Sequence, residues 1–415
     1  MRGDVRGEAS ASMRVLARGC ASRPLVSRRT WMMAAAGKRE VRNAGLWRLV
    51  SATAWLLAVG GVLPLGGGLG LPRWGFPLLG RAVAQEAAPR YAEHQDLSYY
   101  LDAQGQKVAI KTPADWAKRR AHVLAQMQTV MGEVPPASRR VPLEMKVLEE
   151  VTVEGLRRRK ISYQTEPATR VHAYLFLPKD AAEPKRPAVL CLHQTIALGK
   201  QEPAGMGGNP NLHYALHLAQ RGYVTLAPDY PSFGEYQYTF PADAGYLSGS
   251  MKAIYDNMRA VDLLQSLQEV DGERIGCIGH SLGGHNTMFT AVFEPRIKAL
   301  VSNCGFTRFH KYYNGALMGW TSDRYMPRIR TVHHNNPDEV PFDFTEIVAA
   351  FAPRPFLASA PVRDSNFEVS GVKDCITVAR PIYELHGVAG NLQANYPESE
   401  HDFPADARDV AYRFF

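Results

Sequence analysis

The residues with the clearest chemical meaning form a short run from Gly279 to Gly284, with the sequence GHSLGG, which fits the pattern G-x-S-x-G. The run follows an apolar stretch that predicts a strand and precedes residues that predict a helix. A strand-to-helix turn of this kind is sharp enough to leave a serine Oγ exposed. It needs small residues two before and two after the serine, because a Cβ there would collide with neighbouring backbone. We therefore predict that Ser281 is a nucleophile.

A serine hydroxyl becomes a useful nucleophile only when a base takes its proton and a third group orients that base. In folds that use this turn, an acid and then a histidine follow the serine, on loops after later strands. Asp364 lies on the loop directly after the apolar run Pro355–Ala358, and His401 lies in the last loop before a short C-terminal helix. The chain order therefore predicts a triad of Ser281, Asp364 and His401.

Other residues compete for these roles. Asp374 is the alternative acid, although it lies farther from the strand that precedes Asp364. His280 and His285 flank the serine, but a histidine one residue away cannot easily fold back on Oγ, and His285 should ride on the following helix. We interpret both as surroundings of the serine rather than as its base. The adjacent His333 and His334 make a poor pair of metal ligands, because neighbouring side chains on an extended segment point to opposite sides.

The negative oxygen that forms during acyl transfer needs hydrogen-bond donors. One should be the backbone N–H of Leu282, at the start of the helix after the turn, and another should come from the loop after an earlier strand. That loop begins Leu192-His193-Gln194-Thr195. We therefore expect Gln194 or Thr195 to supply the second donor.

These residues require a fold that brings distant loops together. Two stretches around 143–153 and 158–163 and a third at 171–177 predict strands that open the sheet in antiparallel fashion. From residue 187 onward, short continuous apolar runs alternate with helical segments, at 188–192, 224–227, 275–278, 299–301 and 355–358. Strands without polar alternation, joined by helices, indicate a parallel sheet covered on both faces. The fold class is therefore α/β.

The chain divides into three predicted parts. Residues 1–84 form a leader, residues 85–140 form an N-terminal helical extension packed on the core, and residues 141–415 form the catalytic domain. Within the extension, Thr112-Pro113-Ala114-Asp115 provides an N-cap hydroxyl, an early proline and an acid, which together predict a helix start. Within the domain, residues 306–345 fit no regular period and are rich in aromatic residues, so we expect a lid-like insertion that forms a wall for substrate.

The leader holds most of the chain's positive charge. It contains 13 Lys/Arg and 3 acidic residues, whereas the whole chain has a formal charge of +8, so residues 85–415 carry −2. The basic balance therefore gives no support to a nucleic-acid partner. The basic flank is followed by the uncharged segment 49–72 and by a small-x-small site at 82–84, which is typical of an export signal. We expect a periplasmic or secreted protein, with a membrane anchor as the alternative because the uncharged segment is almost long enough to span.

The 5 cysteines have neither disulfide-framework nor metal-site spacing, and we interpret them as buried thiols. The predicted chemistry requires no metal and no organic cofactor.

Taken in order, the motifs resemble the α/β-hydrolase superfamily, in particular its bacterial dienelactone-hydrolase and acetyl-xylan-esterase-like group. The resemblance covers the chain from about Trp116 and rests on Leu192–Thr195, Ala227–Tyr230 with Phe233–Glu235, Gly279–Gly284, Pro361–Phe367 and Glu400–Pro404. It implies a mostly parallel eight-stranded sheet and the same triad. Two differences limit the transfer: Gln194 stands where many members have glycine, and dienelactone hydrolase itself uses a cysteine nucleophile. Asp229 is expected, as in similar hydrolases, to belong to a structural turn.

The leading hypothesis is an exported serine hydrolase that cleaves carboxylic esters, including acyl esters of carbohydrates, through an acyl-enzyme. Two alternatives stay open. A serine peptidase of prolyl-oligopeptidase type shares the surroundings of the serine, although such enzymes usually carry a large additional domain. A catalytically inactive hydrolase fold used for binding is the other, because fold alone does not guarantee activity.

Overall fold

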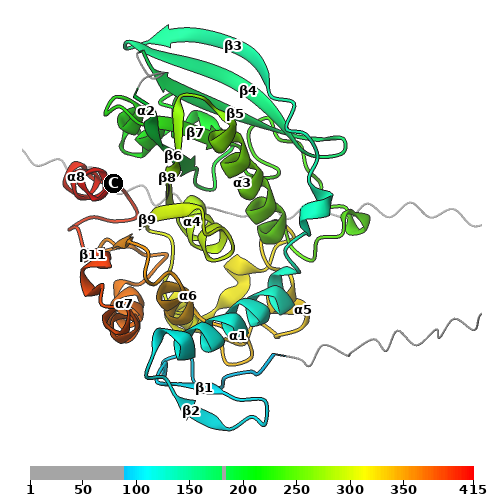
Figure 1. The fold of residues 1–415 in the computed structure, drawn as a ribbon, viewed down its shortest axis with the longest axis vertical. Helices are drawn as coiled ribbons and strands as arrows, with labels where there is room; N and C mark the ends of the chain where they lie inside the picture. The colour runs from blue at the N-terminus through cyan, green and yellow to red at the C-terminus, as the bar shows by residue number, and fades with distance from the viewer. Residues whose placement is uncertain (1–87, 180–183) are drawn as a thin grey trace, which may run out of the picture. The chain divides into compact units, whose positions relative to one another are not determined.

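A nine-stranded sheet lies at the centre of the computed structural model, which describes residues 88–179 and 184–415 (Figure 1). Its strands run in the order β11-β10-β9-β8-β6-β7-β5-β4-β3. Their bounds are β3 Lys146–Val153, β4 Leu156–Glu166, β5 Thr169–Pro178, β6 Arg186–Leu192, β7 Val224–Pro228, β8 Val270–His280, β9 Ile297–Asn303, β10 Phe356–Ser359 and β11 Leu392–Asn395. The predicted leader, including its uncharged segment, lies outside the described residues.

The sheet has the two halves that the sequence predicted. The strands β3, β4, β5 and β7 pair in antiparallel fashion, and β7, β6, β8, β9, β10 and β11 pair in parallel. The sheet has nine strands rather than eight because β11 escaped prediction. That strand is four residues long and only Leu392 in it is fully buried, so it carries no apolar run. The α/β fold class with a mostly parallel sheet is confirmed.

Helices cover both faces of the sheet. Alternate residues of β6 show this, because Ala188 and Leu190 belong to one apolar core and Val189 and Cys191 to another. The first core includes the helices α1 Pro113–Met131, α3 Gly249–Ser266, α4 Leu282–Phe293, α6 Phe344–Ala350 and α7 Val369–Leu385. The second includes α2 Tyr214–Ala219 and α8 Ala405–Phe414, which Figure 1 shows on the opposite side of the sheet.

The N-terminal extension contains the predicted helix and a hairpin that was not predicted. The helix α1 starts at Thr112 with a capping box, in which Thr112 accepts from the N–H of Asp115 and Asp115 accepts from Thr112. Trp116 and Met127 on its inner face are buried in the main core. The hairpin of β1 Tyr99–Leu101 and β2 Lys107–Ala109 has strands of three residues, too short to give a pattern in the sequence.

Residues 306–345 form short helical turns rather than long elements. They include 3₁₀ helices at Phe309–Gly315 and Leu317–Trp320 and the single-turn helix α5 Arg328–Thr331. The segment is held by ring contacts, since the centre of the Trp320 ring lies 5.9 Å from the ring centre of Phe309 and 5.5 Å from that of Phe344. It is therefore a packed wall beside the carboxyl ends of the parallel strands.

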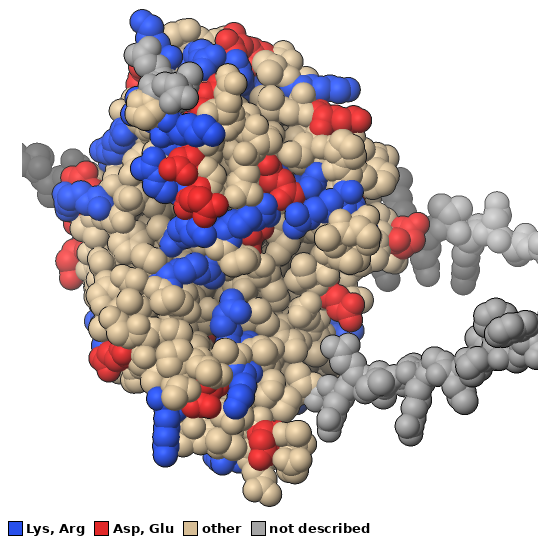
Figure 2. All heavy atoms as spheres, viewed as in Figure 1, with Lys and Arg blue, Asp and Glu red and all other residues tan. Residues whose placement is uncertain are grey.

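The outer face of β3 and β4 carries charges of both signs, which Figure 2 shows interspersed on the visible side. Each basic residue of β4 has an acidic partner: Arg158, for example, lies 3.7 Å from Glu149, and Lys160 lies 2.6 Å from Glu235. The positive charge of β4 is thus compensated locally. Among residues 88–179 and 184–415, no helix is both long and apolar enough to span a bilayer.

Candidate active site

Ser281 occupies the sharp turn between β8 and α4. Its backbone has φ 55° and ψ −117°, a conformation that costs energy for a residue with a Cβ and persists only where the surroundings impose it. The close backbone packing that the neighbouring glycines permit imposes it here. A Cβ on Gly279 would lie 2.2 Å from the backbone of Gly283, and a Cβ on Gly283 would lie 1.8 Å from the carbonyl oxygen of Leu192. The turn therefore holds Ser281 at the floor of a pocket, next to the loop that follows β6.

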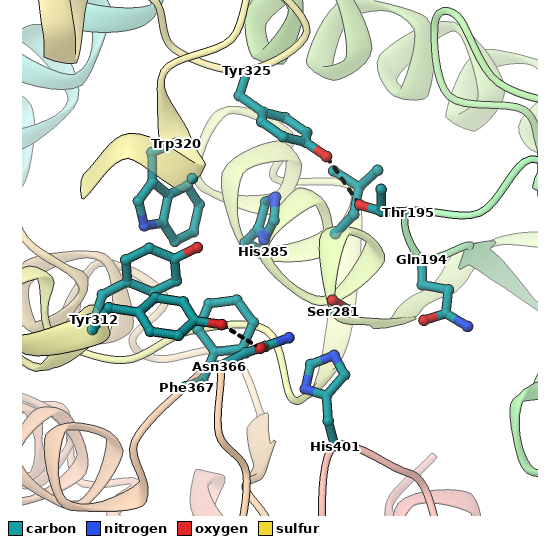
Figure 3. A pocket seen from close by; sticks show the side chains of 13 residues that line it. Gln194, Thr195, Ser281, His285, Tyr312, Trp320, Tyr325, Asn366, Phe367 and His401 are labelled. Atoms are coloured by element: carbon teal, nitrogen blue, oxygen red, sulfur yellow. Dashed lines mark hydrogen bonds between the residues drawn. The ribbon is translucent and has the colours of Figure 1, made fainter. Parts of the chain in front are cut away.

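His401 and Asp364 meet from two separate loops. The Nδ1 atom of His401 lies 3.0 Å from Oδ1 and 2.9 Å from Oδ2 of Asp364, whose side chain is 1% exposed. Oδ1 also accepts the backbone N–H groups of Asn366 (2.8 Å) and Phe367 (3.1 Å), which fix the carboxylate. Because an ionised carboxylate only accepts, we assign the imidazole proton to Nδ1 and leave Nε2 as an acceptor. Figure 3 shows the His401 ring directed at Ser281.

The loop after β6 is held by His193. The backbone N–H of Tyr230 donates to Nε2 of His193 (2.9 Å), so the ring proton is on Nδ1, which donates to the carbonyl of Gln194 (2.6 Å). The N–H and C=O groups of one trans peptide point in opposite directions. Fixing the Gln194 carbonyl on His193 therefore turns the N–H of Thr195 the other way. Both Gln194 and Thr195 line the pocket, together with Leu282 at the start of α4.

A buried ion pair braces the same loop. Asp229 accepts from the backbone N–H of Lys200 (2.8 Å) and pairs with its ammonium group (2.6 Å), and both side chains are fully buried. Asp229 also accepts from the N–H of Glu235 at 3.0 Å. These contacts tie the loop after β6 to the loop after β7, in agreement with the structural part expected of Asp229.

Of the residues that competed with the predicted triad, Asp374 lies elsewhere, and His280 and His285 are weaker bases than an ordinary imidazole. Asp374 pairs with Arg308 at 2.9 Å rather than with His401. Burial lowers the pKa of His280 well below the usual value, and the neighbouring His401 acts in the same direction. Burial also lowers the pKa of His285 to about 3. Both rings are therefore uncharged at neutral pH.

The pocket above Ser281 has a volume of about 290 Å³, at the small end of the range of about 300–1,000 Å³ for small-ligand sites. Its walls are aromatic side chains from the insertion and from the Asp364 loop, namely Tyr312, Tyr313, Trp320, Tyr325 and Phe367. The amide side chain of Asn366 lies beside these rings (Figure 3). No Asp, Glu, Lys or Arg is among the described residues that line it. The pocket thus suits an uncharged group.

The sequence predicted the wall in the aromatic insertion, which includes Trp320 and Tyr325, but it indicated no function for Tyr312, Tyr313 or Phe367. It also missed His193, whose part depends on a contact with Tyr230, 37 residues away. The aromatic content of residues 306–345 was the available signal for the wall. For His193 the signals were its place directly after a buried strand and its membership of the Leu192–Thr195 motif.

Three side chains approach each other closely enough to suggest a metal site: the ligand atoms of His280, Cys304 and His401 lie within 4.8 Å of one another. Each already hydrogen-bonds within the protein, His401 to Asp364, His280 to Asn303 and Cys304 to the carbonyl of Asp402. Burial also raises the pKa of the Cys304 thiol well above its usual value, and the nearby Asp364 adds to this. The arrangement is explained by protein partners.

The site as a whole combines a strained serine, a histidine whose free nitrogen faces that serine, a buried carboxylate behind the histidine, and backbone N–H groups beside the serine. Such a set suits nucleophilic attack on a carbonyl followed by proton transfer.

Comparisons with known proteins agree with this fold. The profile of the Abhydrolase family matches residues 103–394. The Bacillus subtilis protein YtaP, which is named as a hydrolase, is 29% identical over 313 residues, 71% of this chain and 98% of YtaP. Acetyl esterase Axe7A of Xylanibacter ruminicola is 27% identical over 161 residues, 34% of each protein. The glucuronoyl esterase from Solibacter usitatus superposes with a TM-score of 0.61 at 18% identity, covering 79% of this chain and 98% of that one.

Proposed function

The chain belongs to the Abhydrolase family, and from this premise we propose that it is a serine hydrolase of carboxylic esters. The α/β-hydrolase fold predicted from the sequence is thereby confirmed, whereas the reaction is a proposal. Its main support is the pairing of His401 with the buried Asp364 beside a serine in a strained strand-to-helix turn. Esterase names among the relatives and structural neighbours support it as well.

In the proposed reaction, Oγ of Ser281 attacks the ester carbonyl while Nε2 of His401 takes the hydroxyl proton. Asp364 holds the proton on Nδ1 and stabilises the imidazolium that forms. The new Oγ–C bond gives a tetrahedral oxyanion. Collapse of this species breaks the bond to the leaving alcohol, which receives the proton from His401 and departs, leaving an acyl-enzyme. Water, activated by the same nitrogen, then attacks the acyl carbon and releases the acid and the free serine.

The oxyanion would lie between the backbone N–H of Leu282 and that of Thr195. Leu282 begins α4, so the positive end of the helix dipole adds to its hydrogen bond. Of the two candidates on the loop after β6, Thr195 is the better donor, because the hydrogen bond of His193 to the Gln194 carbonyl turns the next N–H away from His193. Each such donor is worth about 10²–10³ in kcat.

The proposed substrate is an uncharged ester, including acyl esters of carbohydrates. The small neutral pocket has aromatic faces against which a ring can stack, and amide and hydroxyl groups that can bind its oxygens. We further propose that the protein is exported, since residues 1–84 have the basic flank, uncharged stretch and small-x-small site of a signal. N-terminal sequencing of protein taken from a bacterial periplasm checks this: cleavage near residue 84 supports export, and an intact leader retained with the membrane supports the anchor.

The proposed reaction is tested with a matched panel of small acyl esters and peptide anilides, using the wild type and Ser281→Ala. We expect ester hydrolysis, with an initial burst of alcohol from substrates that acylate the serine faster than water deacylates it, and no activity in the variant beyond background. Faster cleavage of anilides than of esters would favour the peptidase alternative. A folded wild type inactive on both classes would favour a binding protein.

A further inference from the structure

Asn303 is the last residue of β9, the strand that lies between β8, which leads to Ser281, and β10, which leads to the Asp364 loop. In the sheet it pairs with His280 on one side and with Ser359 on the other. It is fully buried. It therefore lies below the point where the three proposed catalytic residues meet.

The backbone of Asn303 holds the nucleophile. Its carbonyl accepts the N–H of Ser281 at 2.9 Å, so the ladder between β8 and β9 extends one residue beyond the end of β8. This bond fixes the strained backbone of Ser281 and therefore the place of its side chain.

The side chain of Asn303 holds the histidine loop. Its Nδ2 group donates to the carbonyl of Asp402, the residue after His401, at 3.2 Å, and to Nδ1 of His280 at 2.6 Å. The His280 ring in turn packs against the His401 ring, with 4.7 Å between their centres. One amide group thus supports the loop of His401 from behind and orients a ring that lies beside His401.

The orientation of this amide is fixed, at a cost. The carbonyl of Asp402 can only accept, so the NH₂ group must face it, and Oδ1 of Asn303 is left buried without a partner. An unsatisfied buried oxygen of this kind destabilises the folded state. An apolar residue of the same volume would avoid that penalty but would leave the carbonyl of Asp402 and Nδ1 of His280 without this donor, so the asparagine is explained by what its NH₂ group holds.

We propose that Asn303 is a positioning residue. It sets the place of His401 relative to Ser281, because it binds the backbone of Ser281 and the loop that carries His401. This inference rests on the proposed hydrolysis. Removal of the side-chain amide would loosen the histidine loop without detaching it, because Asp364 still holds the ring and the carboxylate of Asp402 is still bound by Asn209 (2.8 Å) and Asn211 (2.6 Å). Misplacement of a catalytic group by about 1 Å costs about 10²-fold in rate.

The test compares Asn303→Leu, which keeps the volume and removes the amide, with Asn303→Ala. Asn257→Leu is the matched control, because its buried Nδ2 group donates to Oγ1 of Thr290 at 2.9 Å and it contacts none of the three proposed catalytic residues. Steady-state kinetics on a small ester and thermal unfolding are measured for each. We expect kcat of both Asn303 variants to fall about tenfold to a hundredfold with KM within about twofold, as misplacement of a catalytic group predicts. The control should keep its kcat even if its Tm falls.

Three results separate the possibilities. If kcat of Asn303→Leu stays within about twofold of the wild type, the positioning inference is wrong. If the Asn303 and Asn257 variants lose kcat equally and in proportion to their loss of Tm, Asn303 has only a structural part and the inference is again wrong. If the wild type cleaves no ester, the proposed function fails, and that outcome is visible before any variant is made. Should Asn303→Ala not fold, the isosteric leucine variant and its control still decide the question.

Discussion

Asp364→Asn is the substitution for which the structure gives the sharpest expectation. Oδ1 of Asp364 accepts two backbone N–H groups, those of Asn366 and Phe367. In the variant, the amide oxygen must take that position, since an NH₂ group there would face two donors. The NH₂ group then takes the place of Oδ2, 2.9 Å from Nδ1 of His401.

A proton on Nδ1 of His401 would face that NH₂ group, and the oxygen at the Oδ1 position, 3.0 Å away, already accepts two backbone N–H groups, so the tautomer with its proton on Nε2 becomes favoured. A protonated Nε2 cannot accept the proton of Ser281. The same change in a Ser-His-Asp triad lowers kcat by about 10⁴, which corresponds to about 5.5 kcal/mol of transition-state stabilisation. Because Asp364 lies behind His401 and is buried, we expect KM to change little.

The assay is steady-state hydrolysis of a small chromogenic ester by Asp364→Asn. Asp374→Asn is the control, since Asp374 is the other acid that the sequence offered and its carboxylate pairs with Arg308 instead. We expect full activity in the control and a shift of the thermal midpoint of only a few degrees in either variant. A fall in kcat of less than about tenfold in Asp364→Asn would refute the assignment of the acid, given the size of this effect in a triad. A fall in kcat that is larger in Asp374→Asn than in Asp364→Asn would refute it as well.

Three other predictions concern packing and pH. Gly283→Ala places a Cβ 1.8 Å from the backbone oxygen of Leu192, and such overpacking costs about 1–3 kcal/mol, so urea unfolding should show a loss at least of that size together with a lower kcat; an unchanged variant would contradict the tight turn. Trp320→Ala removes a side chain that is 3% exposed and should cost about 3–5 kcal/mol in the same measurement, whereas a smaller loss would mean that the wall is not packed as described. Burial lowers the pKa of His94, but the hydrogen bond to Glu346, the negative charges of Glu346 and Asp343 and the Val340 carbonyl together outweigh this and leave the pKa raised. The stabilisation from His94 is therefore complete below the unfolded pKa of about 6.5 and is lost as pH rises through the folded value. The difference in free energy of unfolding between wild type and His94→Asn should then shrink from pH 6 to pH 9. A difference that grows with pH would contradict the raised pKa of His94.

Features that depend on neighbours in the sequence could be predicted. The capping box at Thr112 and the run around Ser281 are local, and the apolar run that contains Cys191 marks a strand because both of its faces are buried. In a sheet of this kind the loops that follow parallel strands lie at the same edge, so the chain order predicted that Asp364 and His401 lie close together. Their side chains meet there.

Features that depend on contacts across the fold could not. The ring of Tyr312 becomes a pocket wall only because Trp320 and Phe367 pack against it, at 5.4 and 5.7 Å. Asn303 gave no signal at all, because a polar residue at the end of a strand is ordinary until its amide is seen against the carbonyl of Asp402, 99 residues away. The tautomer of His193 likewise follows from the backbone of a distant loop.

The central proposal is that Ser281 is the nucleophile of an esterase, and labelling with a fluorophosphonate tests it most directly. The folded protein is treated with the probe, residual ester hydrolysis is followed over time, and the modified peptide is identified by mass spectrometry. We predict that activity falls in step with the attachment of one adduct, that the adduct lies on Ser281, and that Ser281→Ala is unlabelled. Continued ester hydrolysis by protein fully labelled at Ser281, or inactivation through an adduct on another residue, would contradict the account.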